Sequence, residues 1–190
     1  MRIQESIQQS IAVKEQILKD ETMIRRIQDA AEMMVESLKN GGKIHFCGNG
    51  GRAADAQHLA AELSGRFYYN RPPLNAEALH CNSSYVTAVA NDFGYDLIYS
   101  RLIECAAKKG DVLVGISTSG NSANILNAYK VCRQMGVKII SFTGETGGKM
   151  KDDSDILFNV PSKDTPRIQE SHIMIGHIIC ELVEGMMFPK

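Results

Sequence analysis

The stretch DVLVGISTSGNSA, residues 111–123, decides the fold of this chain. Residues 112–116 form a continuous apolar run, which is typical of a parallel strand buried on both faces of its sheet. The run passes directly into small polar residues at 117–122, and a helical pattern follows over 123–135. A strand that ends in such a turn and leads into a helix is the repeating unit of parallel α/β proteins.

The same plan of strand, turn and helix occurs earlier in the chain. Residues 43–47 predict a short strand, the turn GNGG follows, and the alanine-rich residues 53–63 predict a helix. Strands that alternate with helices predict a parallel sheet covered on both faces. The other predicted elements are two helices within 2–39, strands at 76–80, 138–142 and 156–160, and a long helix over 165–187.

The composition narrows the class of protein. The 190 residues are close to the size of one domain, so we expect a single domain over 1–190, with a helical extension at 1–40 and an α/β core at 41–190. The net charge of −1 leaves no excess of basic residues for nucleic acid. No apolar run approaches the length of about 20 residues that crosses a bilayer. We therefore expect a soluble cytoplasmic protein with neither a nucleic-acid nor a membrane partner.

The five cysteines are widely scattered and include no C-x-x-C pair. This pattern favours small buried hydrophobic residues in a reducing compartment over a disulfide or zinc framework. Cys47 follows an apolar run, and a nucleophilic role for it stays open as an alternative. The others are Cys81, Cys105, Cys132 and Cys180.

The turn at 117–122 carries the strongest functional signal. Hydroxyl groups and the free N–H groups at a helix N-terminus together bind phosphate, whereas a helix N-cap needs only one such side chain. The nucleotide motif GxxxxGK[ST] is absent, so the sequence favours a sugar phosphate over a nucleotide. The hydroxyl residues of the turn are Ser117, Thr118, Ser119 and Ser122, and Gly120 permits close approach of the backbone.

A second candidate site lies on the predicted helix after the GNGG turn. His58 and Glu62 are four residues apart, so their side chains share one helix face. Such a pair can hold a divalent metal, or it can combine a general base with a hydrogen-bonding partner. Taken alone, a pair at this spacing is more often part of an exposed helix face. On the final helix, Gln169 and His177 lie beside the apolar stripe. His172 lies on the stripe and is expected in the core or at an interface.

Several short motifs occur along the chain, namely CGNGG at 47–51, AADAQH at 53–58, NDFG at 91–94, which is expected to be a loop, GISTSGNS at 115–122, and RIQE at 167–170. In these motifs the chain resembles the phosphoheptose isomerases (sedoheptulose 7-phosphate isomerases) of the sugar-isomerase (SIS) superfamily, over nearly its whole length. The resemblance implies a flavodoxin-like, three-layer α/β sandwich with a central parallel sheet, assembled as a homotetramer with active sites at subunit interfaces.

The resemblance also implies a reaction and a set of site residues. The expected reaction converts D-sedoheptulose 7-phosphate into D-glycero-D-manno-heptose 7-phosphate through an enediol, the first step toward the activated heptose of bacterial surface polysaccharides such as lipopolysaccharide. Glu62 is the expected base and His177 the expected acid. One zinc ion per subunit is expected on His58, Glu62, Gln169 and His177. The expected substrate contacts are Asn49, Gly50, Gly51, Glu62, Asn91, Asp92, Ser117, Thr118, Ser119, Ser122 and Gln169.

Two positions depart from the common family pattern, and one alternative class of function remains. Arg52 stands where serine is common, and an arginine there would either contact the phosphate or obstruct the pocket. Pro166 stands where some members have aspartate, and Asp164 is the nearest substitute. The alternative is a non-catalytic SIS-domain regulator that binds a replication initiator protein or senses a sugar phosphate. The presence of all four expected metal ligands favours the enzyme.

Overall fold

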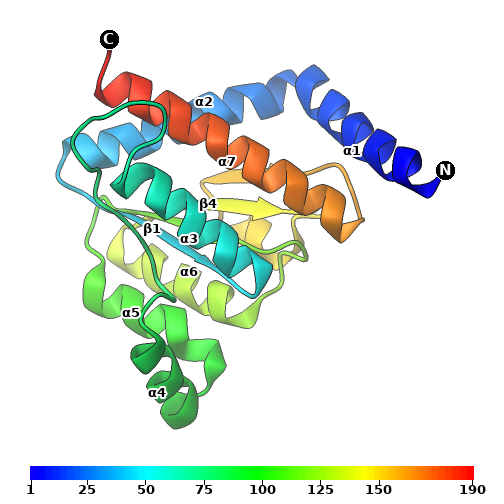
Figure 1. Ribbon diagram of the computed structural model, residues 1–190. Coiled ribbons are helices and arrows are strands. Elements are labelled where there is room, and N and C mark those ends of the chain that lie inside the picture. The colour runs from blue at the N-terminus through cyan, green and yellow to red at the C-terminus, as the bar shows by residue number, and fades with distance from the viewer.

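Five parallel strands form the centre of the computed structural model, which describes residues 1–190 (Figure 1). The strand order is β2-β1-β3-β4-β5, and the register pairs Ile44 with Val112 and Val112 with Lys138. Each predicted strand is present, with ends shifted by two residues or fewer. The strands are β1 (Ile44–Gly48), β2 (Ala76–Ala78), β3 (Val112–Ile116), β4 (Lys138–Thr143) and β5 (Ile156–Asn159).

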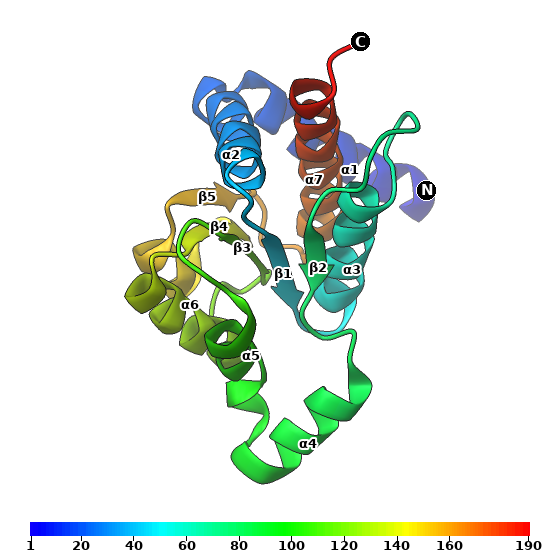
Figure 2. The same ribbon diagram turned by 90° about the vertical axis from the view of Figure 1, so that its left-hand side faces the viewer.

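Helices cover both faces of the sheet, and the expected flavodoxin-like three-layer sandwich is confirmed. α2, α3 and α7 lie on one face and α5 and α6 on the other (Figure 2). Strand side chains alternate between the two layers, so Phe46 packs in one apolar cluster and Cys47 in the other. The α-helices are α1 (Arg2–Lys19), α2 (Glu21–Lys39), α3 (Gly51–Ser64), α4 (Ser83–Phe93), α5 (Ile98–Ala106), α6 (Ala123–Met135) and α7 (Thr165–Met187), and short 3-10 helices are η1 (Tyr95–Leu97) and η2 (Gly148–Asp153).

The segment between β2 and β3 differs from the sequence prediction. No helix was predicted there, and the structure has α4 and α5. The prediction of a loop at residues 91–94 is wrong, because Asn91 and Asp92 lie in the last turn of α4. Asn82 begins this helix by accepting a hydrogen bond from the Tyr85 N–H at 3.0 Å, and Gly94 ends it with a φ of +92°. Only one residue of α4 is buried, so its apolar pattern carries little helical signal.

The first helix leaves most of its apolar side chains uncovered. α1 extends away from the sheet layers and contacts α2 and α7 (Figure 1). Its apolar residues Ile3, Ile7 and Leu18 are 75%, 55% and 73% exposed. The next helix is capped by Asp20, whose carboxylate accepts hydrogen bonds from the first-turn N–H groups of α2. No helix in the structure is both long enough and apolar enough to span a membrane.

The cysteines fall into two groups. Cys47, Cys132 and Cys180 are buried as predicted, but Cys81 and Cys105 are exposed, so the expectation fails for these two. Cys81 follows the edge strand β2, and Cys105 lies on the outer side of α5. Neither side chain is covered by another element of the fold. Burial raises the pKa of the Cys47 thiol well above its ordinary value, which keeps it protonated. A nucleophilic Cys47 therefore has no support.

Candidate active site

The direction in which successive strands are added to the sheet reverses between β1 and β3. β1 and β3 are neighbours, and the helices that follow them, α3 and α6, pack on opposite faces. In open α/β sheets this arrangement leaves a ligand-binding crevice at the carboxyl ends of the two strands. The turn after β1 and the hydroxyl-rich turn after β3 both lie at these ends. The fold therefore brings together the two turns that the sequence singled out.

Three hydroxyl groups converge in the turn after β3. The Ser117 Oγ is 2.9 Å from the Ser122 Oγ and 3.4 Å from the Ser119 Oγ. Ser122 occupies the N-cap of α6, but its hydroxyl does not cap the helix. Gly120 has a φ of +65°, and a Cβ at this position would overlap the carbonyl of Gly147. The turn is thus shaped by close backbone packing, and its hydroxyls are not consumed by helix capping.

A pair of amide side chains joins the two turns. Asn49 donates to the Asn124 Oδ1 at 2.9 Å, and Asn124 donates back to the Asn49 Oδ1 at 2.8 Å. The Tyr95 hydroxyl also donates to the Asn49 Oδ1, at 3.2 Å. Asn124 and Tyr95 were not predicted from the sequence, because neither belongs to a motif and their contact with Asn49 exists only in the folded chain.

A cluster of possible metal ligands joins α3 to α7. Atoms of His58 and Glu62 on α3 and of His177 on α7 all lie within 4.8 Å of one another. The His58 Nε2 is 2.8 Å from the His177 Nε2 and 3.3 Å from the Glu62 Oε1. The His58 side chain is 48% exposed and that of Glu62 is 23% exposed, so solvent reaches the cluster. We call these three residues the His-Glu-His cluster.

The His-Glu-His cluster fits a divalent metal ion. Imidazole nitrogens and a carboxylate oxygen are common ligands of zinc and of other divalent ions. With Zn–N bonds of about 2.0–2.1 Å, two ligands at a tetrahedral angle lie about 3.3 Å apart. The facing nitrogens of His58 and His177 would therefore need to separate by roughly 0.5 Å, which small ring movements provide.

Close packing of the two helices supports this cluster. Gly176 precedes His177, and Leu59 follows His58. A Cβ on Gly176 would lie 2.7 Å from both terminal methyl groups of the buried Leu59. The missing side chain at this position lets α7 approach α3 beside His58 and His177.

The fourth predicted metal ligand is placed differently from the other three. Gln169 lies on α7, eight residues before His177, and is partly buried. An α-helix rises about 1.5 Å per residue, so the two positions are roughly 12 Å apart along the axis. Both side chains would have to extend toward each other to share one ion.

Two predicted substrate residues lie outside the sheet layers. Asn91 and Asp92 are exposed on α4, which stands apart from the sheet layers (Figure 2). The Asn91 amide donates to the Asp92 Oδ1 at 2.9 Å. The segment that follows α4 contacts the turn after β1 through Tyr95, whose hydroxyl donates a hydrogen bond to Asn49.

The residues at the unusual positions differ in their surroundings. Arg52 is 8% exposed, and its Nε donates to the Asp55 Oδ2 at 2.6 Å. Asp164 is exposed at the N-cap of α7, and Pro166 lies in the first turn, where proline is tolerated.

His172 is buried as expected and donates to the Thr143 carbonyl at 2.9 Å. Burial lowers the pKa of His172 to about 4, so the ring is neutral at neutral pH.

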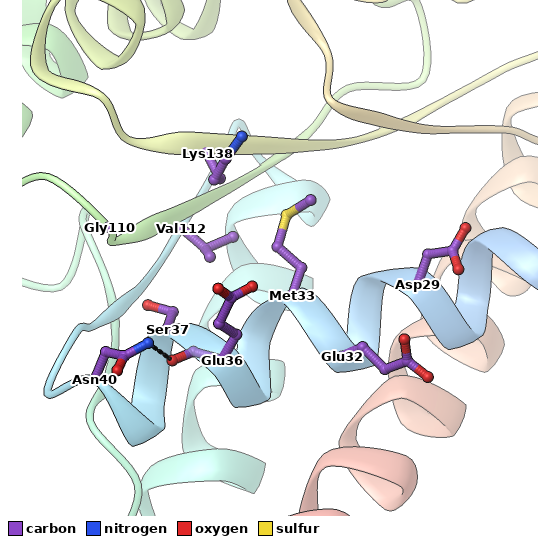
Figure 3. Close-up of a pocket in the computed structure, with 9 residues that line it drawn as sticks. All are labelled: Asp29, Glu32, Met33, Glu36, Ser37, Asn40, Gly110, Val112 and Lys138. Carbon is purple, nitrogen blue, oxygen red and sulfur yellow. Dashed lines mark hydrogen bonds between the residues drawn. The ribbon is translucent and has the colours of Figure 1, made fainter.

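A cavity of about 430 Å³ lies at the opposite end of the sheet (Figure 3). It lies between α2 and the beginnings of β3 and β4, where the strands enter the sheet. Glu36 and Lys138 are among its lining residues, and the Asn40 amide donates to the Glu36 carbonyl at its edge. None of the predicted site residues lines this cavity, so the chemistry that the sequence predicts is centred elsewhere.

Comparison with known proteins identifies the chain. Residues 7–144 match the model of the SIS domain, which defines the class of protein. A phosphoheptose isomerase of Aneurinibacillus thermoaerophilus is 51% identical over 186 residues, which is 98% of this chain and 94% of that protein. One of Mycobacterium tuberculosis is 49% identical over 180 residues, which is 95% of this chain and 92% of that protein. The chain belongs to the phosphoheptose isomerase family and is an isomerase.

Solved structures agree with this assignment. The phosphoheptose isomerase of Neisseria gonorrhoeae matches with a TM-score of 0.90 at 42% identity, and 97% of each chain is covered. That of Francisella tularensis matches with a TM-score of 0.92 at 35% identity, with 96% of each chain covered. The resemblance found in the sequence is confirmed, and nothing among these relatives favours a non-catalytic regulator.

Proposed function

We propose that this isomerase converts D-sedoheptulose 7-phosphate into D-glycero-D-manno-heptose 7-phosphate, the first step toward an activated heptose for surface polysaccharide such as lipopolysaccharide. The main support is that the side chains of His58, Glu62 and His177 come together from two helices, α3 and α7. Both helices begin at the carboxyl edge of the sheet. An aldose–ketose isomerase needs a base and an acid near one carbon pair and a separate anchor for the phosphate. We assign the base and the acid to the cluster and the phosphate anchor to the turn after β3.

The proposed proton transfers use Glu62 and His177. Glu62 removes a proton from C1 of the ketose while His177 donates a proton to O2, and an enediol results. His177 then takes the proton from O1, and Glu62 returns its proton to C2, which gives the aldose. The Glu62 Oε1 lies 3.3 Å from the His58 Nε2, so a neighbouring ring fixes the carboxylate within the cluster.

We propose that zinc is the ion of the cluster, one per subunit, held by His58, Glu62, His177 and Gln169. When bound, zinc would polarise the two oxygens of the reacting carbon pair. The proposed substrate contacts are Asn49, Gly50, Gly51, Glu62, Asn91, Asp92, Ser117, Thr118, Ser119, Ser122 and Gln169.

The phosphate anchor can be tested apart from the chemistry. Ser119→Ala and Ser122→Ala each remove a hydroxyl from the turn after β3 without touching the His-Glu-His cluster. We expect each variant to bind the substrate more weakly by about 1–3 kcal/mol, the cost of removing one partner from a hydrogen bond. KM and kcat/KM measure the effect, and Thr22→Ala on the exposed surface of α2 is the control. Unchanged values in both serine variants would place the phosphate elsewhere.

We also propose that the chain forms a homotetramer in the cytoplasm and that residues 1–190 are one domain. An apolar groove of about 350 Å³ between α1, α2 and α7 supports assembly. Ile11, Leu18 and Ile24 line the groove and are 50%, 73% and 46% exposed. Uncovered apolar patches of this kind mark interaction surfaces, and a second copy of the chain would supply the matching helices.

The proposed reaction is tested directly with the purified protein. Incubation with sedoheptulose 7-phosphate and zinc is expected to produce the aldose signals of D-glycero-D-manno-heptose 7-phosphate in an NMR spectrum. Removal of the metal with a chelator is expected to stop the reaction, and added zinc is expected to restore it. If no aldose forms at any metal concentration, the proposed reaction is wrong and a regulatory role becomes the better hypothesis.

A further inference from the structure

A buried arginine closes the end of the helix that carries His58 and Glu62. The Arg71 side chain is 2% exposed and lies beyond the last turn of α3. Its Nη2 donates to the carbonyl of Glu62 at 2.8 Å, and its Nη1 donates to the carbonyl of Leu63 at 2.7 Å. The last carbonyl groups of a helix have no partner within the helix and attract a positive charge. Arg71 therefore fixes the backbone of Glu62 itself.

The same arginine is paired with a buried glutamate on α7. The Arg71 Nε donates to the Glu184 Oε1 at 2.9 Å, and the Glu184 side chain is 1% exposed. Glu184 also accepts hydrogen bonds from the N–H groups of Phe67 and Tyr68, at 2.9 and 2.8 Å. Burial raises the pKa of Glu184, but these N–H groups and the guanidinium lower it more, so that the carboxylate stays ionised. Both buried charges are thus paired with each other and hydrogen-bonded to backbone groups.

The pair joins the two helices that form the His-Glu-His cluster. Glu184 lies seven residues after His177, so the two side chains project from similar faces of α7, two turns apart. The Phe67 backbone is held by Glu184, and the Phe67 ring lies 5.8 Å from the His177 ring between centroids. Arg71 and Glu184 therefore connect the backbone of one cluster residue with the surroundings of another.

We propose that Arg71 and Glu184 are positioning residues that set the separation of Glu62 and His177. This inference rests on the proposed function of the cluster. Neither residue reaches the cluster with its own side chain, and each acts through α3, α7 and the segment 65–71. Loss of a partner that orients metal ligands typically lowers metal affinity or activity by about 10–100-fold.

The decisive variant is Glu184→Gln, because it keeps the size of the side chain and removes its charge. We expect its affinity for zinc, measured by competition with a chromophoric chelator, to fall by about 10–100-fold. We expect kcat to fall in the same range while KM changes by less than about threefold, because the phosphate anchor lies on β3 and α6. Arg71→Lys is the second variant: it keeps the charge but loses the planar fork of donors, and it is expected to show the same split.

Asp111→Asn is the matched control. Asp111 is 1% exposed and accepts hydrogen bonds from the N–H groups of Lys43 and Lys108, while its Oδ2 lies 3.1 Å from the His45 Nε2. It therefore resembles Glu184 in burial and partners, but it lies where β1 and β3 begin. We expect both Glu184→Gln and Asp111→Asn to lower the melting temperature, but we expect Asp111→Asn to leave zinc affinity and kcat within about threefold of the parent.

The outcomes separate this inference from the proposed function. A loss of zinc affinity that is confined to the Arg71 and Glu184 variants supports the positioning role. An equal loss in Asp111→Asn, or no loss in any variant, overturns it. An unaltered protein that binds zinc but does not isomerise sedoheptulose 7-phosphate contradicts the proposed function, and the zinc affinities of the variants still decide the positioning role.

Discussion

Replacing Glu62 by glutamine is expected to lower kcat for sedoheptulose 7-phosphate by about 10²–10⁴-fold, the contribution of a positioned general base. Glutamine has the same shape and keeps an oxygen that can ligate a metal, but its amide cannot accept and return a proton near neutral pH. The Glu62 carboxylate faces His58 at 3.3 Å and is partly exposed, so the change needs no repacking of the core. KM is expected to change much less than kcat.

Zinc content must be measured together with the rate. Metal analysis of the Glu62→Gln protein shows whether the ion is still bound when kcat is determined. Glu181→Gln, an exposed position on α7, is the control for removal of a negative charge near the same helix surface. If the zinc-loaded Glu62→Gln enzyme turns over at the normal rate, then another group is the base.

Removal of residues 1–20 is expected to abolish both assembly and activity. The parent protein should scatter light as about four chains, and the shortened protein as one or two. The physical reason is that α1 holds much of the apolar surface that has no cover within the subunit, including Ile7, Ile11 and Leu18. A four-chain assembly that hides this surface would also fix the helices next to the His-Glu-His cluster.

The boundary of this deletion requires a control. Residue 20 is the aspartate that caps α2, so a deletion of residues 1–20 also removes hydrogen bonds to Thr22 and Met23. A deletion of residues 1–19 keeps the cap and is expected to give the same loss of assembly. A monomer with full isomerase activity would disprove the link between assembly and function.

The predictable part of the fold rests on long, regular patterns. The apolar run of β3 and the stripes of α2 and α7 extend over enough residues to give the type and position of each element. α4 could not be found in this way, because it buries only Val89 and most of its surface faces solvent. Its signal was local instead, namely the capping residue Asn82 and the terminating Gly94.

Residue spacing alone predicted the candidate site only where its residues are neighbours in sequence, and His177 and Gln169 were named through the family resemblance. The spacing of His58 and Glu62 places both on one helix face, and the hydroxyls of the turn after β3 lie within six residues. The approach of His177 depends on how α7 packs on α3, which no spacing reveals. The same holds for Arg71 and Glu184, which are 113 residues apart and form their pair only in the folded chain.

The glycine at position 176 bears on which ion the proposed metal site would accept. Divalent ions bind a given set of nitrogen and oxygen donors in a fixed order of strength, so proteins select among them by geometry. Here α7 meets α3 through a backbone position without a side chain, directly beside His58 and His177. If the His-Glu-His cluster holds a metal ion, the separation of α3 and α7 at this point limits the radius of the ion that fits, and a larger residue at position 176 is expected to increase this separation and shift the preference toward larger ions.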